Sequence, residues 1–127
     1  MNSARVFLIA GALFGMAGVV LGAFGAHALK TKLDAASLSS WDIAVLYQVV
    51  HALALLAVGI WLRQGGNTTA LNVAGWSFLI GVFLFSGSLY LLAGTSARWL
   101  GPVTPLGGVA FVVGWAALVW AALKIHD

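Results

Sequence analysis

The chain has 127 residues, of which 62% are hydrophobic and only 7% charged, and its mean hydropathy is +1.05. A soluble domain carries about 25% charged residues, so this composition excludes an ordinary soluble protein and predicts membrane lipid as the main partner. The net charge of +3 comes from lysines and arginines spread between apolar runs. Because they form no basic patch, we expect no nucleic-acid partner. The chain has no cysteine, which excludes disulfides and thiolate metal sites.

Four apolar segments are long enough to cross a bilayer, which takes about 20 helical residues. They cover residues 6–29, 41–62, 70–94 and 105–123. The segments between them are short and rich in turn formers, so neighbouring spans are expected to run antiparallel. The sequence therefore predicts an all-α integral membrane protein. Its single domain, residues 1–127, is expected to hold four transmembrane helices in an up-down antiparallel bundle.

The first span carries a seam of glycines and ends on a histidine. The glycines are Gly11, Gly15, Gly18, Gly22 and Gly25. Their spacing places all five within about 40° of one line along a helix, with His27 about 160° away from that line. A seam of small residues lets another helix approach closely in lipid. It indicates either packing within the chain or a homo-oligomer contact through the first helix. The run is too long for the apolar part of a signal peptide, about 7–15 residues, so we expect it to be retained.

The later spans carry the remaining polar residues. Ser39 and Asp42 resemble a capping box that opens the second helix, and Tyr47, Gln48 and His51 share one face of it, within an arc of about 100°. In the third span, Ser86 and Tyr90 share a face while Ser88 points away. Thr104, followed by a proline, is predicted to cap the fourth helix.

These polar side chains gather toward the side of the first and third loops, and the opposite half of the spans is almost entirely aliphatic or aromatic. The candidate pocket residues are His27, Tyr47, Gln48, His51, Ser86, Ser88, Tyr90 and Thr104. Polar groups in a span tend to face the bundle interior, so we expect a network of Gln48, His51, Ser86 and Tyr90. It serves either as structural hydrogen bonding or as a polar pocket near one interface that binds a small ligand, lipid headgroup or ion.

The sequence argues against a metal, a cofactor or catalysis. His27 and His51 differ in depth by about 15 Å if the second helix begins at Trp41, and the carboxylates lie in or beside the first loop or at the C-terminus. No serine–histidine–acid arrangement or phosphate-cradling motif is visible, so we expect no catalytic residues. A proton-coupled exporter needs a buried acid, which these spans lack. A small oligomeric channel or transporter, or a structural protein that assembles through the glycine seam, remains an alternative.

Four sequence blocks occur in order with short spacers, namely LGAFGAHAL, YQVVHALALL, FLFSGSLYLLAG and PVTPLGGVAFVVGW. Together they resemble the bacterial small membrane protein family called domain of unknown function 423, over residues 5 to 123. The resemblance implies a four-span inner-membrane protein and no activity that transfers to this chain. The residues that carry it are Gly22, Gly25, His27, Tyr47, Gln48, His51, Ser86, Gly87, Ser88, Tyr90, Pro102, Thr104, Pro105, Gly107 and Gly108.

An even number of spans predicts that both termini lie on the same side of the membrane. Arg5, Arg63 and Lys124 belong to that side, while Lys30, Lys32 and Arg98 belong to the other. This even distribution gives the positive-inside rule nothing to act on. We expect the termini to be cytoplasmic.

Overall fold

The computed structural model describes residues 2–126, which form helices joined by short connecting segments, with no strand in this range. Its elements are α1 (Ser3–Ala26), α2 (Ala35–Arg63), α3 (Thr68–Gly81), the π-helix η1 (Val82–Gly87), α4 (Ser88–Gly94), the 3-10 turn η2 (Arg98–Leu100) and α5 (Val103–Leu123). Because α3, η1 and α4 are continuous, four helical segments are long and apolar enough to cross a membrane. The predicted all-α, four-span architecture is confirmed.

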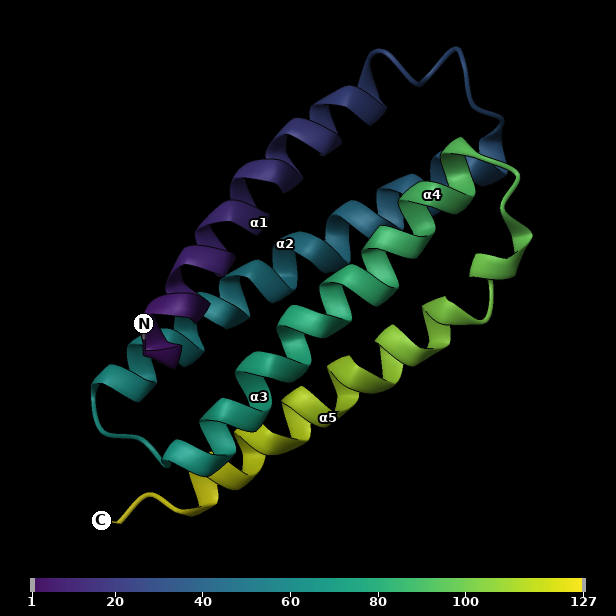
Figure 1. The fold of residues 1–127 in the computed structure, drawn as a ribbon. Helices are drawn as coiled ribbons and strands as arrows, with labels where there is room; N and C mark the ends of the chain where they lie inside the picture. The colour runs from purple at the N-terminus through teal and green to yellow at the C-terminus, as the bar shows by residue number, and fades with distance from the viewer. Residues whose placement is uncertain (1, 127) are drawn as a thin grey trace.

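Two helical hairpins lie side by side (Figure 1). In the first, α1 packs along α2; in the second, α5 packs along α3 and η1. The hairpins meet mainly through α2 on one side and α3, η1 and α4 on the other, with a smaller contact between α1 and α3. Within the described residues, α1 and α5 do not pack together. Successive helices run in opposite directions, so both ends of the chain lie at the same end of the bundle (Figure 1).

The helix starts differ from the predicted ones. α2 begins at Ala35, six residues before the expected start, because the Asp34 side chain accepts a hydrogen bond of 2.7 Å from the Ser37 amide. The Ser39–Asp42 capping box is therefore wrong, since both residues lie inside the helix. At α5 the backbone is already helical at Pro102, and no side chain caps this start. Thr104 is thus not the N-cap, and its hydroxyl bonds to Ser88 instead.

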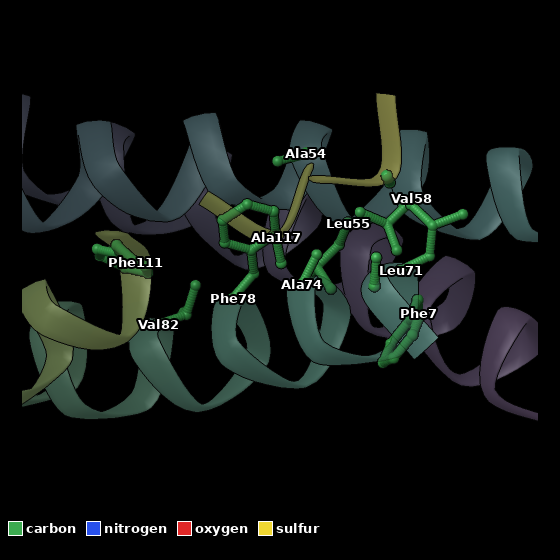
Figure 2. Packing of buried hydrophobic residues seen from close by; sticks show 12 residues of the cluster. Phe7, Ala54, Leu55, Val58, Leu71, Ala74, Phe78, Val82, Phe111 and Ala117 are labelled. Atoms are coloured by element: carbon green, nitrogen blue, oxygen red, sulfur yellow. The ribbon is translucent and has the colours of Figure 1, made fainter. Parts of the chain in front are cut away.

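The hydrophobic core lies between the two hairpins, toward the end that carries the termini. Figure 2 shows Phe7, Leu55, Val58, Leu71 and Phe78 packed together there, and all five are fully buried. Glycines leave space for the rings: a Cβ at Gly114 would clash with the Phe78 ring, and one at Gly75 would clash with the Phe7 ring. Small residues of this kind permit the close helix contacts on which packing in lipid depends.

Candidate functional site

Gln48, in the middle of α2, forms hydrogen bonds to two other helices. Its side-chain amide donates a hydrogen bond of 2.9 Å to the Phe14 carbonyl of α1. Its side-chain carbonyl accepts one of 2.7 Å from the Tyr90 hydroxyl of α4. The Gln48 side chain is buried. Because the bilayer core supplies no water, these two bonds satisfy the polar atoms of this side chain within the protein.

His51 lies one turn further along α2 and connects it to α5. The Trp115 indole N–H donates to His51 Nε2 at 3.0 Å, and His51 Nδ1 lies 2.7 Å from the Tyr47 carbonyl oxygen. Because Nε2 accepts, the proton resides on Nδ1, which donates to that carbonyl. The imidazole also stacks on the Phe111 ring, with centroids 3.6 Å apart and planes 9° from parallel. His51 is therefore a neutral ring held on both nitrogens and on one face.

The serines form two further links between helices. Ser86, in the π-helix, donates from its hydroxyl to the Ala44 carbonyl of α2 at 2.8 Å. Ser88 donates to the Phe85 carbonyl at 2.9 Å and its hydroxyl also meets that of Thr104 in α5. A π-helix widens the turn by one residue and often marks a functional position. Here it lets Ser86 face α2 while Ser88 faces α5.

The structure divides the predicted polar residues among several contacts. Gln48 and Tyr90 are bonded directly, and Ser88 and Thr104 are bonded directly. Tyr47 meets His51 through its backbone carbonyl, and its ring lies near parallel to the imidazole. Among the described residues, Ser86 bonds only to a backbone carbonyl, that of Ala44. His27 lies apart from the others, exposed at the C-terminal end of α1.

The depth of this site follows from the early start of α2. Gln48 and His51 come 13 and 16 residues after Ala35 in a helix of 29 residues. At 1.5 Å per residue, they lie about 20 and 24 Å along a helix of about 43 Å. The two side chains are therefore near the middle of the bundle, and the Ser88–Thr104 pair lies closer to the end that carries the first and third loops.

The sequence does not indicate several of the hydrogen-bond partners in these contacts. The Phe14 and Ala44 carbonyls are backbone groups, which every residue possesses, and Trp115 lies 64 residues from His51. Trp41 donates its indole N–H to the Leu21 carbonyl at 2.9 Å and packs edge-on against the Tyr90 ring. A tryptophan deep within a span, as Trp115 is, was the one available hint.

Four of the five seam glycines face α2. A Cβ at Gly11 would lie 2.8 Å from the Ala52 carbonyl, one at Gly18 would lie 2.7 Å from Val49, and one at Gly25 would lie 2.6 Å from Trp41. At Gly22 the nearest atom, on Val45, would be 3.3 Å away. Gly15 has no atom within 4 Å of such a position.

A cavity of about 340 Å³ opens at the surface between α2 and α5, lined by Leu46, Tyr47, Val50, His51 and Trp115. Within residues 2–126, every buried polar side-chain atom has a hydrogen-bond partner. The Tyr47 side chain is 40% exposed, and no hydrogen bond among the described residues uses its hydroxyl. In this wall, Tyr47 is thus the residue with a hydroxyl left for another molecule.

The described residues hold no group of three His, Cys, Asp or Glu side chains placed to share a metal ion. The arrangement around His51 instead consists of hydrogen bonds and stacked rings. What it offers chemically is an apolar wall with one phenolic hydroxyl.

Comparison with known proteins agrees with this architecture. The sequence profile of the family described as "Protein of unknown function (DUF423)" matches residues 21–108. The chain belongs to this family. It is 50% identical over 121 residues to a UPF0382 membrane protein of Staphylococcus saprophyticus, covering 95% of this chain and 99% of the relative. It is 43% identical over 120 residues to the UPF0382 membrane protein YwdK of Bacillus subtilis, covering 94% and 98%.

No solved structure matches the chain. The relatives are named as membrane proteins of bacteria, and the family description assigns no activity. The resemblance drawn from the four sequence blocks is thereby confirmed.

Proposed function

We propose that this DUF423 protein is a non-enzymatic protein of the bacterial inner membrane that binds an amphiphilic small molecule entering from the bilayer. The site is the cavity between α2 and α5, and the ligand is a hydrocarbon chain that ends in one hydrogen-bonding group. The observation that carries the proposal is the Tyr47 hydroxyl, unbonded within the described residues and beside a cavity of about 340 Å³. In hydrocarbon an unpaired hydroxyl costs several kcal/mol, so a ligand that bonds to it is favoured.

The surrounding contacts support binding of a chain rather than of an ion. His51 is already bonded at both ring nitrogens, one of them to Trp115. Leu46 and Val50 supply aliphatic surface on the same wall. The volume falls in the range of about 300–1,000 Å³ that is typical of small-molecule sites. The wall thus offers one hydroxyl and an apolar surface, which matches a simple amphiphile.

Fluorine NMR on protein labelled with 3-fluorotyrosine tests this proposal, because the chain has only two tyrosines. Titration of the delipidated protein in detergent with 1-dodecanol is expected to shift the Tyr47 resonance saturably. Tyr90, whose hydroxyl bonds to Gln48, serves as an internal control and is expected to move little. Tyr47→Phe assigns the resonance, and dodecane, which lacks the hydroxyl, is expected to give no saturable shift. Equal responses to dodecanol and dodecane, or no response at Tyr47, would overturn the proposal.

We also propose, as a second candidate function, assembly into a homo-oligomer through the first helix. The observation that favours it is Gly15, the seam glycine that α2 leaves uncovered, beside the exposed side chains of Leu13 and Met16. Gly15→Leu is expected to convert an oligomer into a folded monomer in detergent. Gly18→Leu, which would strike Val49, is expected to destabilise the fold itself. Light scattering that gives the same mass for wild type and Gly15→Leu would count against assembly at this position.

A further inference from the structure

A second kind of cavity lies at the end of the bundle that carries the termini. Figure 1 shows the last turns of α5 beside the connection between α2 and α3. Between them is a cavity of about 350 Å³, lined by Trp61, Gln64, Gly65, Gly66, Asn67, Ala121, Lys124, Ile125 and His126. The cavity lies at the ends of helices that are long and apolar enough to span a membrane, where we expect lipid headgroups.

The turn between α2 and α3 shapes one wall of this cavity. Gly65 adopts φ +89°, a conformation that favours glycine. The next amide, that of Gly66, donates 3.0 Å back to the Trp61 carbonyl. A Cβ at Gly66 would lie 2.6 Å from the Trp61 indole nitrogen, so the turn lies directly against the ring. The indole is thereby fixed at the helix end, a depth at which tryptophan is enriched in membrane proteins.

The polar groups that line the cavity include several hydrogen-bond donors. Lys124 follows α5 and contributes an ammonium group. The Asn67 side-chain oxygen accepts from the Ala70 amide at 3.0 Å to cap α3, which leaves its side-chain NH₂ to donate outward. α3 begins directly after Asn67, and the positive end of a helix favours an anion. Among the described residues, no carboxylate lines the cavity.

The same cavity also has apolar surface, from the Trp61 ring and from Ala121 and Ile125. A freely soluble anion gains nothing from such a surface, whereas a phospholipid places its first chain carbons there. A neighbouring cavity of about 400 Å³ at the same end of the bundle is lined in part by Arg63 and Thr68, so cationic side chains border two hollows at this headgroup level.

We propose that the cavity between the α2–α3 turn and the end of α5 binds the phosphate of an anionic phospholipid headgroup, with Lys124 as the principal charge and Asn67 and Trp61 as additional donors. Basic hollows between transmembrane helices are suited to anionic lipid headgroups. The site lies at the opposite end of the bundle from His27 and is separate from the cavity beside Tyr47, so it does not depend on the function proposed above.

Native mass spectrometry of the full chain in detergent tests the site directly. The probes are dioleoylphosphatidylglycerol and dioleoylphosphatidylcholine, which share their chains and differ in headgroup charge. Wild type is expected to bind phosphatidylglycerol more tightly, and Lys124→Gln is expected to weaken that binding about fivefold, the effect of one basic side chain near a charged surface. Lys124→Arg keeps the charge and is expected to retain the preference. Lys32→Gln, an exposed position in the first loop, is the matched control and is expected to change nothing.

Three results would overturn the proposal. The first is equal binding of the two lipids by wild type. The second is an equal loss of phosphatidylglycerol binding in Lys124→Gln and Lys32→Gln, which would indicate a general effect of net charge. The third is complete displacement of phosphatidylglycerol by millimolar inorganic phosphate, which would identify a free-phosphate site instead of a lipid site. Melting temperatures within 2 °C of each other, about the shift expected for a change below 1 kcal/mol, show that the variants are folded.

Discussion

Two neighbouring glycines in α5 have opposite environments. Gly107 lies against the π-helix, where an added Cβ would be 2.7 Å from the Phe85 Cα atom, whereas Gly108 has no atom within 4 Å of such a position. Both lie within the same helix, so an alanine gains the same helix propensity at each. The difference between the two substitutions therefore isolates the close approach of α5 to η1.

Gly107→Ala is expected to lower the free energy of unfolding by about 1–3 kcal/mol, because a backbone in contact cannot move aside as a side chain can. Gly108→Ala is expected to leave it unchanged or to raise it by up to about 1 kcal/mol, the propensity difference between alanine and glycine in a helix. Unfolding in mixed micelles with increasing sodium dodecyl sulfate, followed by circular dichroism, measures both values. Equal stabilities for the two variants would show that α5 and η1 are not in backbone contact.

The bond between Trp115 and His51 is open to measurement by a double-mutant cycle. Trp115→Phe and His51→Phe each remove the bond while keeping an aromatic ring, and the expected coupling energy is about 0.6 kcal/mol, with an upper limit near 1.7 kcal/mol for hydrogen bonds between membrane helices. Trp115→Phe combined with Ser86→Ala is the control pair, since Ser86 bonds elsewhere, and its coupling is expected to be near zero. A coupling no larger than that of the control pair would mean that the contact contributes nothing specific.

At the scale of single residues, the sequence predicts which side chains are polar and which share a helix face, but it does not predict their hydrogen-bond partners. Gln48 and His51 lie on one face of α2, as their spacing indicates, and both are buried. They nevertheless bond to different neighbours, Gln48 toward α1 and α4 and His51 toward α5. The partner of a buried polar group depends on the rotation of other helices, and periodicity within one span carries no information about that rotation.

At the scale of elements, the four spans follow from hydropathy, while their ends and their irregularities depend on local bonds. The segment VFLFSG reads as an uninterrupted continuation of a helix, yet it forms the π-helix η1. The Ser86 bond to the Ala44 carbonyl and the contact of Phe85 with Gly107 hold the widened turn in place. Both are tertiary contacts, so the sequence of the segment alone does not reveal the widening.

The start of α2 gives a testable pH dependence. Hydrogen bonds from the Ser37 backbone amide and then from its hydroxyl stabilise the charged form of Asp34, which holds the pKa of this carboxyl below its ordinary value. Because the pKa of Asp34 is lowered in the folded state, its cap of α2 contributes fully to stability above the unfolded-state pKa of this carboxyl, which is near 3.9. It is lost as the pH falls through the folded-state pKa. The amide proton shift of Ser37 is therefore expected to titrate with a midpoint below the ordinary pKa of an aspartate.

Asp34→Asn is the matched control for this titration, because asparagine also caps helices but does not ionise in this range. In that variant the Ser37 amide shift is expected to be independent of pH. Asp34→Ala removes the acceptor, and hydrogen exchange of the Ser37 amide is expected to accelerate. A Ser37 shift that titrates in Asp34→Asn as it does in wild type would show that another group is being observed.

At the scale of the whole molecule, the arrangement of two hairpins leaves both α1 and α5 with broad apolar surfaces. Val19 and Val112 are 71% and 69% exposed, values that a soluble protein does not sustain over whole helices but that lipid accommodates. The sequence predicts the number of spans and their antiparallel order. It does not predict that α1 and α5 stay apart, because that depends on which pairs of helices have matching small and large residues.

The positions of the cavities lined by cationic side chains favour one orientation of the protein in the membrane. Each end carries three lysines or arginines, but the cavity lined by Lys124 and the neighbouring one lined by Arg63 both lie at the end with the termini. The negative surface potential of a cytoplasmic leaflet attracts cationic side chains, so we propose that this end, and both termini with it, face the cytoplasm.

Single-cysteine labelling tests this orientation cleanly, because the chain has no cysteine of its own. Thr69→Cys lies near the start of α3 at the end with the termini, Ser96→Cys lies between α4 and η2 at the other end, and both positions are exposed. In intact bacterial cells a membrane-impermeant maleimide is expected to label Ser96→Cys at once and Thr69→Cys only after lysis. The reversed pattern would place the Lys124 cavity in the outer leaflet and would contradict the proposed orientation. Labelling of both cysteines before lysis would mean that the chain inserts in two orientations, which the equal count of three cationic side chains at each end permits.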